Sequence, residues 1–413
     1  MNSREKFDTL EKPLKTPAYL KPVMWILALA NVIPVGGKIK KVNCEGLEPP
    51  FLLLQNHGSF VDFAMAEKAI MPKSCNWVIS IEEFNGREWL LRNIGGIYKR
   101  KFTKDITVVK HVLTSLRERT CVIYPEARFS LAGVNERLDG ALGKLVKKAK
   151  VPVVTFIQNG NFLRSPQWNK SPKRKVRVEG TFTQIVTREE LADIAPEEID
   201  RRINEKFVYD EYQWQFDNKI EINSKYRAHN IHKILYQCPC CKKEFTMDSK
   251  HTKLWCTNCG ASWEMDSYGV LRNEKDSKLD KMVPEWYRWE RGNVKQEVAD
   301  GEYHFEDEVR IEEIKSSHDG FVEIGSGKIT QDENGFLLKG TLLNGEDFEL
   351  HRSVASMYSC HIEYNYKGRG DALELCTLSD TYFVYPKTFN NVLTKLHFAT
   401  EELYDKLYGK SEK

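Results

Sequence analysis

Short apolar runs alternate with helical patterns between residues 40 and 185. Residues 103–119 and 138–149 place apolar side chains on one helical face. Between such segments lie runs with the near-continuous apolar character of strands covered on both faces. These runs are 51–54, 77–81, 121–124, 151–157 and 175–179. The alternation predicts a layered α/β domain with a mostly parallel sheet, over residues 1–225, with charged helix at 187–222.

The pattern changes after residue 225. Residues 230–270 hold two Cys-x-x-Cys pairs, and residues 277–413 alternate and turn like strands. Within the latter, a hairpin is predicted with its turn at Asp332–Gly335. Residues 388–409 have the amphipathic pattern of a closing helix. The sequence therefore predicts a second domain of zinc-ribbon type and a third, small β-barrel-like domain capped by the C-terminal helix.

Polar residues follow the first apolar run directly. Asn56 and His57 come straight after it, and Asp62 follows five positions after the histidine. Ligands of α/β sheets bind at the carboxyl ends of strands, so this turn is a candidate site. His57 would take a proton from a hydroxyl while Asp62 holds the imidazole in one tautomer. The alternative is structural, because Ser59-x-x-Asp62 also has the form of a helix capping box.

Three later segments also end in polar or cationic residues: IGGIYKRK (94–101), VIYPEARFS (122–130) and KVPVVTFIQNG (150–160). In order and spacing, the four segments resemble the blocks of the glycerolipid acyltransferase family, the lysophosphatidic acid acyltransferases in particular. The resemblance covers about residues 40–185. It implies that His57 is the general base and that Asp62 orients it. It also implies a substrate site for a glycerol phosphate, formed by Asn56, Arg100, Lys101, Glu126 and Arg128.

The family resemblance further implies the substrates. The donor would be acyl-CoA or acyl carrier protein, and the acceptor a lysophospholipid, 1-acylglycerol 3-phosphate first. One departure leaves the acceptor open: the family's third block usually reads Pro-Glu-Gly-Thr-Arg-Ser, whereas here the arginine is Arg128, one position earlier. At a strand end this shift points the side chain elsewhere. Another acceptor, a thioesterase using water, and a zinc-ribbon adaptor with a degenerate acyltransferase domain are the alternatives.

The cysteine pairs indicate a metal site. Cys238 and Cys241 precede Cys256 and Cys259 with fourteen residues between the pairs, close to the spacing of a zinc ribbon. Four thiolates leave no open coordination position, so the zinc would be structural, and no catalytic cofactor is expected. Nucleic acid is not an expected partner, because the loop 242–255 carries Glu244 and Asp248 beside its lysines.

Composition and one apolar segment bear on localisation. Ten cysteines in 413 residues are too few for a disulfide scaffold, which favours a reducing compartment. Residues 20–37 form an apolar run with lysines on both sides, too short to span a bilayer. This pattern favours an interfacial helix on an anionic membrane surface, the alternative being a helix packed on its own domain. The expected location is cytoplasmic and peripheral on the membrane.

Overall fold

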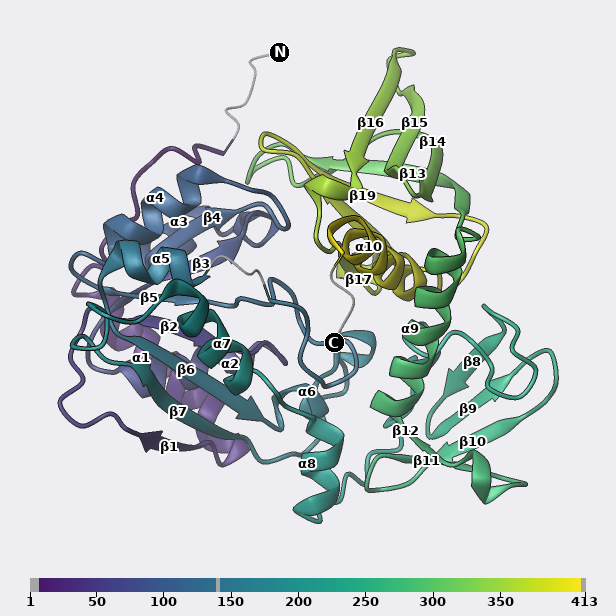
Figure 1. Cartoon of the computed structure of the whole chain (residues 1–413), viewed down its shortest axis with the longest axis horizontal. Coiled ribbons are helices and arrows are strands. Elements are labelled where there is room, and N and C mark those ends of the chain that lie inside the picture. Colours follow the sequence, from purple (N-terminus) through teal and green to yellow (C-terminus); the bar gives the residue numbers. More distant parts are fainter. Residues whose placement is uncertain (1–6, 139–141, 410–413) are drawn as a thin grey trace.

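The computed structural model describes residues 7–138 and 142–409, and three β-sheets organise them (Figure 1). We call residues 7–222 the N-terminal region, residues 223–282 the ribbon region and residues 283–409 the C-terminal region. Each region contains one of the three sheets.

The N-terminal sheet has seven strands in the order β1-β7-β6-β2-β5-β3-β4. They are β1 (Lys38–Val42), β2 (Leu52–Gln55), β3 (Cys75–Ser80), β4 (Gly96–Lys99), β5 (Thr120–Ile123), β6 (Val153–Asn159) and β7 (Glu179–Val186). All neighbours are parallel except β6 and β7, which confirms the predicted mostly parallel sheet. The strand predicted at 175–179 is wrong, because the β7 ladder begins only at Glu179.

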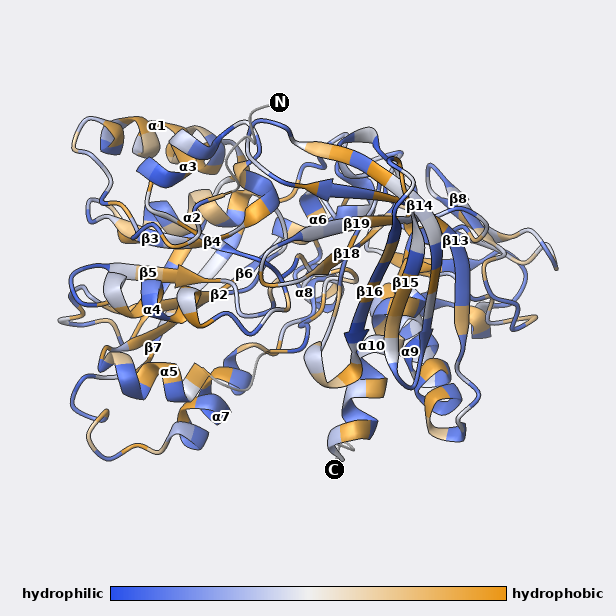
Figure 2. Ribbon diagram, turned by 90° about the horizontal axis from the view of Figure 1, so that it is seen from above, coloured by the Kyte–Doolittle hydropathy of each residue, from blue (hydrophilic) through white to orange (hydrophobic). Residues whose placement is uncertain are grey.

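Helices cover both faces of this sheet (Figure 2). The N-terminal region contains α1 (Leu20–Val32), α2 (Val61–Ile70), α3 (Glu88–Asn93), α4 (Ile106–Ser115), α5 (Leu142–Ala149), α6 (Asn161–Arg164), α7 (Pro196–Lys206) and α8 (Glu211–Asp217). Helices α1 and α2 cover one face of the sheet, and α4, α5 and α7 cover the other. Strand β2 shows why its sequence is continuously apolar. Leu53 packs in the core below α1 and α2, whereas Leu52 and Leu54 pack with α4, α5 and α7 on the other face.

Two predicted helices differ from those observed. The charged helix expected at 187–222 is two helices, α7 and α8, separated by the segment 207–210. Residues 139–141 of the helix expected at 138–149 lie outside the described residues, and α5 covers the remainder from Leu142.

The ribbon region forms a five-stranded antiparallel sheet in the order β12-β11-β10-β9-β8. Its strands are β8 (Met247–Lys250), β9 (Lys253–Cys256), β10 (Ser262–Met265), β11 (Val270–Asn273) and β12 (Lys281–Met282). The sheet therefore continues past residue 270, where the sequence pattern had ended the ribbon.

The C-terminal region contains a seven-stranded antiparallel sheet and two long helices, α9 (Val283–Asp300) and α10 (Leu393–Tyr408). The sheet order is β16-β15-β14-β13-β19-β18-β17. The strands are β13 (Phe305–Ile314), β14 (Phe321–Asp332), β15 (Gly335–Leu342), β16 (Asp347–Ser353), β17 (His361–Glu363), β18 (Ala372–Cys376) and β19 (Thr381–Pro386). The predicted hairpin and closing helix are present, but the sheet is open, because no described pairing joins β16 to β17.

Helix α9 is absent from the sequence prediction, although its ends carry clear signals. Pro284 stands in its first turn, where a missing N–H costs nothing, and Gly301 follows its last residue with φ +75°. The strand-like patterns farther along the chain dominated the prediction for residues 277–413.

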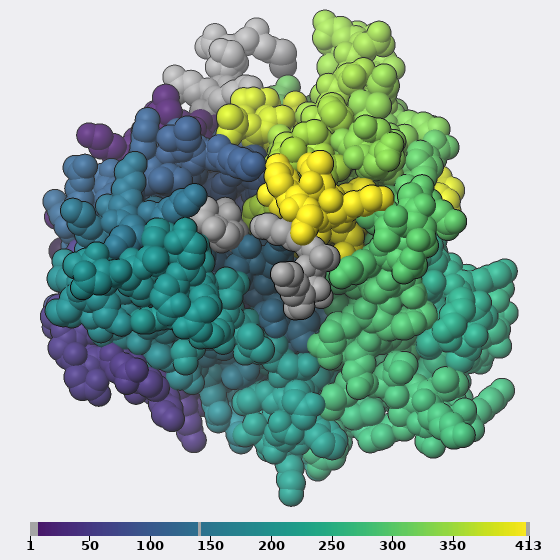
Figure 3. Space-filling model, viewed as in Figure 1, coloured from purple at the N-terminus to yellow at the C-terminus, as the bar shows by residue number. Residues whose placement is uncertain are grey.

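One hydrophobic core joins all three regions. It contains Leu131 and Phe162 from the N-terminal region, Trp263 from the ribbon and Trp286 and Leu396 from the C-terminal region, all nearly inaccessible to solvent. Figure 3 shows the corresponding surfaces in close contact, with the yellow C-terminal residues between the blue and green parts. The predicted domains 1–225, 230–270 and 277–413 share this core, which crosses both boundaries between them. The division of the chain at these boundaries therefore remains a prediction.

Candidate active site

The turn between β2 and α2 brings His57 onto Asp62. Nδ1 of His57 lies 2.9 Å from Oδ2 of Asp62. The same carboxylate oxygen accepts hydrogen bonds from the backbone N–H groups of Gly58 (2.7 Å) and Ser59 (3.0 Å). The carboxylate of Asp62 thus orients the imidazole and also satisfies donors at the start of α2.

Asp62 therefore has the contacts expected of both predicted roles, the orientation of His57 and the capping of α2. The carboxylate half of the capping box forms, but the hydroxyl of Ser59 has no partner among the described residues. Burial raises the pKa of Asp62, against the opposing effect of His57. A cap alone could be met by an exposed carboxylate, whereas this side chain is fully buried behind the histidine.

Amide side chains from β6 and α6 complete the surroundings of Asp62. Asn161 donates to Oδ1 of Asp62 and, at 2.8 Å, to Oε1 of Gln158. Asn56 donates to the carbonyl of Gln158 (2.9 Å) and accepts from its N–H (2.8 Å), which ties the ends of β2 and β6 together. Sequence reasoning missed Asn161, although it directly follows the segment that ends at residue 160.

Two aromatic rings hold the imidazole of His57. Phe129 stacks on it with ring centroids 3.6 Å apart and an interplanar angle of 24°, and the Tyr124 centroid lies at 4.1 Å. The histidine side chain keeps 20% of its surface exposed. Within residues 7–138 and 142–409, Nε2 has no hydrogen-bond partner.

Glu126 contacts the backbone of His57 from the loop after β5. Its carboxylate accepts from the N–H of His57 at 3.3 Å and from the N–H of Glu136 at 2.8 Å, and the hydroxyl of Tyr209 donates to it at 2.9 Å. Burial raises its pKa to about 8. The sequence predicted a substrate-binding role for Glu126; in the structure its oxygens contact protein donors that hold the loop beside His57.

The three predicted phosphate-binding cations all contact the C-terminal region. Arg100 donates to the carbonyl of Leu378 at 3.0 Å. Lys101 lies between Glu82, with which it forms an ion pair, and Glu374, 3.4 Å away. Arg128 is completely buried and forms ion pairs with Glu136 (2.7 Å) and Glu401 (2.8 Å). Phosphate binding by these side chains stays a prediction.

The four predicted zinc ligands converge. The Sγ atoms of Cys238 and Cys259 are 3.7 Å apart, as are those of Cys241 and Cys256, and all four lie within 4.8 Å of one another. A tetrahedral site with zinc–sulfur bonds of about 2.3 Å has sulfur–sulfur edges of about 3.8 Å. The thiol cluster therefore fits a tetrahedral metal ion, while Cys240 is exposed outside it.

A second set of potential metal ligands has a different explanation. Glu82, His361 and Glu374 are buried with their ligand atoms within 4.8 Å of one another. The ammonium of Lys101 contacts both carboxylates, which raise its pKa against the effect of burial. A lysine thus already supplies the cation that these acids require.

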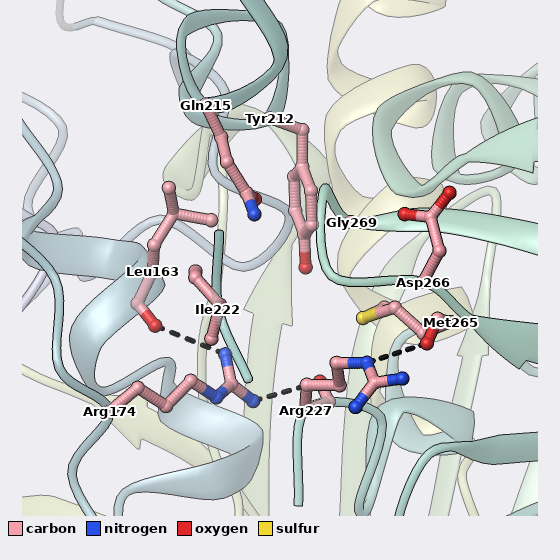
Figure 4. Close-up of a pocket in the computed structure, with 9 residues that line it drawn as sticks. All are labelled: Leu163, Arg174, Tyr212, Gln215, Ile222, Arg227, Met265, Asp266 and Gly269. Carbon is pink, nitrogen blue, oxygen red and sulfur yellow. Dashed lines mark hydrogen bonds between the residues drawn. The ribbon is translucent and has the colours of Figure 1, made fainter. Parts of the chain in front are cut away.

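A small cavity lies where the N-terminal and ribbon regions meet (Figure 4). Arg174 lies beside it and donates to the carbonyls of Leu163 (3.1 Å) and Arg227 (2.9 Å), and burial lowers its pKa to about 10. Residues of the His57 site do not line this cavity, so it belongs to the packing between regions.

Comparisons with known proteins identify the first part of the chain. Residues 37–158 match the family model "Acyltransferase", so an acyltransferase-family domain lies there, which confirms the predicted resemblance. A similar solved structure is the 1-acyl-sn-glycerophosphate (LPA) acyltransferase PlsC from Thermotoga maritima, at 14% identity, 46% coverage of this chain, 77% coverage of that chain and a TM-score of 0.36. No curated protein matches the chain.

Proposed function

We propose that this protein transfers a fatty acyl group from a thioester to the hydroxyl of a lysophospholipid, with His57 as general base. The observation that carries the proposal is the 2.9 Å contact between Nδ1 of His57 and the buried carboxylate of Asp62, on the strand end of an acyltransferase-family domain. With Nδ1–H donated to Asp62, Nε2 is the unprotonated nitrogen that faces the substrate.

The reaction uses this geometry in two steps. Nε2 of His57 takes the proton from the acceptor hydroxyl as its oxygen bonds to the thioester carbonyl carbon. The carbon–sulfur bond then breaks, and the imidazolium returns the proton to the departing thiolate. An ester and a free thiol result, and the enzyme is unchanged. Asp62 stabilises the transient imidazolium and keeps the ring in the productive tautomer.

The finer proposal is that the acceptor is 1-acylglycerol 3-phosphate and the donor is acyl-CoA or acyl carrier protein. The family domain supports this general pairing of donor and acceptor. Incubation with labelled acyl-CoA, or with acyl carrier protein loaded with the same acyl group, and a panel of phosphorylated and neutral lysolipids would identify both substrates. Labelled fatty acid released without a lipid product would instead indicate a thioesterase.

The central test is His57→Ala. Loss of a general base lowers the rate by on the order of 10²–10⁴-fold. The protein should stay folded, because the buried Asp62 keeps its hydrogen bonds from Gly58, Ser59 and Asn161. His304→Ala, on an exposed histidine of the C-terminal region, is the matched control and should retain full activity. Full activity in His57→Ala would overturn the proposal.

We also propose that the four-thiolate site holds one structural zinc ion. Its ligands come from the two Cys-x-x-Cys pairs of the ribbon region, and four thiolates leave no position for a substrate. Elemental analysis of protein purified without chelator should give one zinc per chain. Cys240→Ser should leave the zinc content unchanged, and protein without zinc would contradict the assignment.

Finally, we propose that the enzyme works in the cytoplasm, peripherally on a membrane surface, through α1. Val23, Ile26 and Leu27 are exposed on this helix, whereas Ala28 and Val32 pack in the core with α2. No helix within the described residues has the length and apolarity to cross a bilayer. Lysines flank the segment, as suits anionic lipid.

A triple variant tests this membrane contact. Replacing Val23, Ile26 and Leu27 by serine should reduce binding to anionic vesicles while activity on detergent-dispersed lysolipid survives. The matched control is Val208→Ser, which changes an exposed valine in the segment between α7 and α8. Unchanged vesicle binding of the triple variant would show that α1 does not contact lipid.

A further inference from the structure

The loop after β5 contacts both His57 and the C-terminal region. On one side, Glu126 accepts from the N–H of His57, and the N–H of Ser130 donates to the His57 carbonyl at 2.7 Å. Phe129 stacks on the imidazole. On the other side, Arg128 reaches away from this group of contacts into the C-terminal region. Residues 126–130 are therefore a short mechanical connection between the two.

Both terminal nitrogens of the Arg128 guanidinium already donate to protein partners. Nη2 contacts Glu136 and Glu401, and Nη1 donates to Ser359 Oγ (2.5 Å), the Cys360 carbonyl (3.1 Å) and His397 Nδ1 (3.0 Å). Four of these five partners belong to the C-terminal region. A planar fork with several fixed acceptors holds its position much more firmly than a single ion pair.

The charges around Arg128 are already balanced. Glu401 also contacts Arg291 at 2.7 Å, and burial alone would raise its pKa. The guanidinium groups of Arg291 and Arg128 instead hold that pKa well below the usual range. Burial and Arg128 lower the pKa of His397, so the imidazole is neutral and its Nδ1 can accept. An incoming phosphate would have to displace two buried carboxylates from Arg128.

We infer that Arg128 and Glu401 are positioning residues, through which the C-terminal region holds Phe129 and Glu126 against His57. This inference rests on the proposed function of His57. The C-terminal region thereby completes the active site without touching the substrate. The family's third block is thus used differently here, because its shifted arginine anchors the loop to α10.

The decisive variants are Glu401→Gln and Arg128→Lys, in the full-length protein. Each variant weakens the contacts of the Arg128 guanidinium with Glu401, so Phe129 and Glu126 lose their fixed place beside His57. The expected result is a fall in kcat on the order of 10²-fold, as misplacement of about 1 Å can produce. The KM for the acceptor should stay within about twofold, because no group that binds substrate uniformly is removed.

A phosphate-binding arginine would give the opposite pattern. Glu401→Gln would then retain kcat, and Arg128→Lys, which keeps a point charge for phosphate, would raise KM for phosphorylated acceptors while neutral acceptors were unaffected. Either observation would overturn the inference. Because Glu401→Gln could unfold the interface, Ser359→Ala is the milder variant: it removes only the hydroxyl that accepts from Arg128 and donates to Glu401 at 2.6 Å. Its kcat should fall by a smaller factor with KM unchanged.

Asp405→Asn is the matched control. Asp405 lies one turn after Glu401 on α10 and contacts Arg137 across the same interface at 2.7 Å. No described contact links Arg137 to His57, so kcat should be retained. An equal loss in Asp405→Asn would reduce the effect to general loosening of the interface and overturn the inference. If His57→Ala is itself active, the proposed function fails first, and the two failures are distinguishable.

Discussion

The two loops that meet at His57 are held in opposite ways. In the loop 56–62, the carboxylate of Asp62 accepts only from its own region: from the N–H groups of Gly58 and Ser59 and from the amide of Asn161. The flanking residues Leu53 and Ala64 pack in the core around α1 and α2. The loop 125–130 instead depends on partners more than 200 residues away in the sequence, such as Ser359 and Glu401.

The residues that follow the second loop extend this difference. Leu131, Ala132 and Val134 pack in the core shared with the ribbon and the C-terminal region. The second loop therefore depends on the docking of the other two regions, whereas the buried partners of Asp62 in the first loop all belong to the N-terminal region. Residues close in the sequence form the His57–Asp62 pair, and long-range packing positions Phe129 and Glu126 beside it.

Removal of the metal should produce the largest difference between the two loops. Structural zinc contributes on the order of 10 kcal/mol to the folding of small zinc domains, and the four thiols proposed to bind zinc border the shared core. Chelation should therefore increase hydrogen exchange in residues 126–134 far more than in residues 56–62, with loss of activity. Equal exchange in both loops would show that the ribbon does not support the second.

Asp62→Asn attacks the first loop alone. Asparagine retains much of the cap but favours the wrong tautomer of His57, so the rate should fall by on the order of 10⁴-fold with the fold intact. Exchange in residues 126–134 should not change. A stable and fully active Asp62→Asn protein would return Asp62 to a capping role only.

Arg128→Met attacks the second loop. It leaves the buried carboxylates of Glu136 and Glu401 without their shared cation, which costs about 3–5 kcal/mol of unfolding free energy. Denaturant unfolding measures the change. Arg201→Met, at an exposed ion pair on α7, is the control and should not change stability measurably. An unchanged midpoint in Arg128→Met would remove the distinction between the loops.

Glu126→Gln should give the smallest effect, a change in how the free energy of unfolding depends on pH. The folded protein holds the Glu126 proton up to about pH 8, whereas the unfolded chain releases it near pH 4.3. The folded state therefore binds more protons in this window, and the stability contribution is lost as pH rises, by about 1.4 kcal/mol per pH unit. The variant should lose this slope, measured by unfolding at pH 5, 6 and 7. An unaltered slope would mean that Glu126 is ionised in the fold.

The sequence by itself determined most strands of the N-terminal sheet and the local chemistry of the first loop and of the thiol cluster. The near-continuous apolar runs predicted strands with helices on both faces, because a strand such as β2 must bury side chains on each side. His57 and Asp62 are five residues apart, and the cysteine pairs follow a known spacing. Such sites depend on nearby residues, so their geometry is largely specified by the turn that carries them.

Only the tertiary structure shows what the three predicted phosphate-binding cations contact. In the sequence, Arg100, Lys101 and Arg128 are cations at predicted strand ends. The sequence does not distinguish a side chain that binds phosphate from one that anchors an interface. Their partners Leu378, Glu374 and Glu401 come from the C-terminal region. A buried charge requires a partner, but the sequence of one segment cannot name a partner brought to it by the docking of another. The difference between the two loops therefore exists only in the folded molecule.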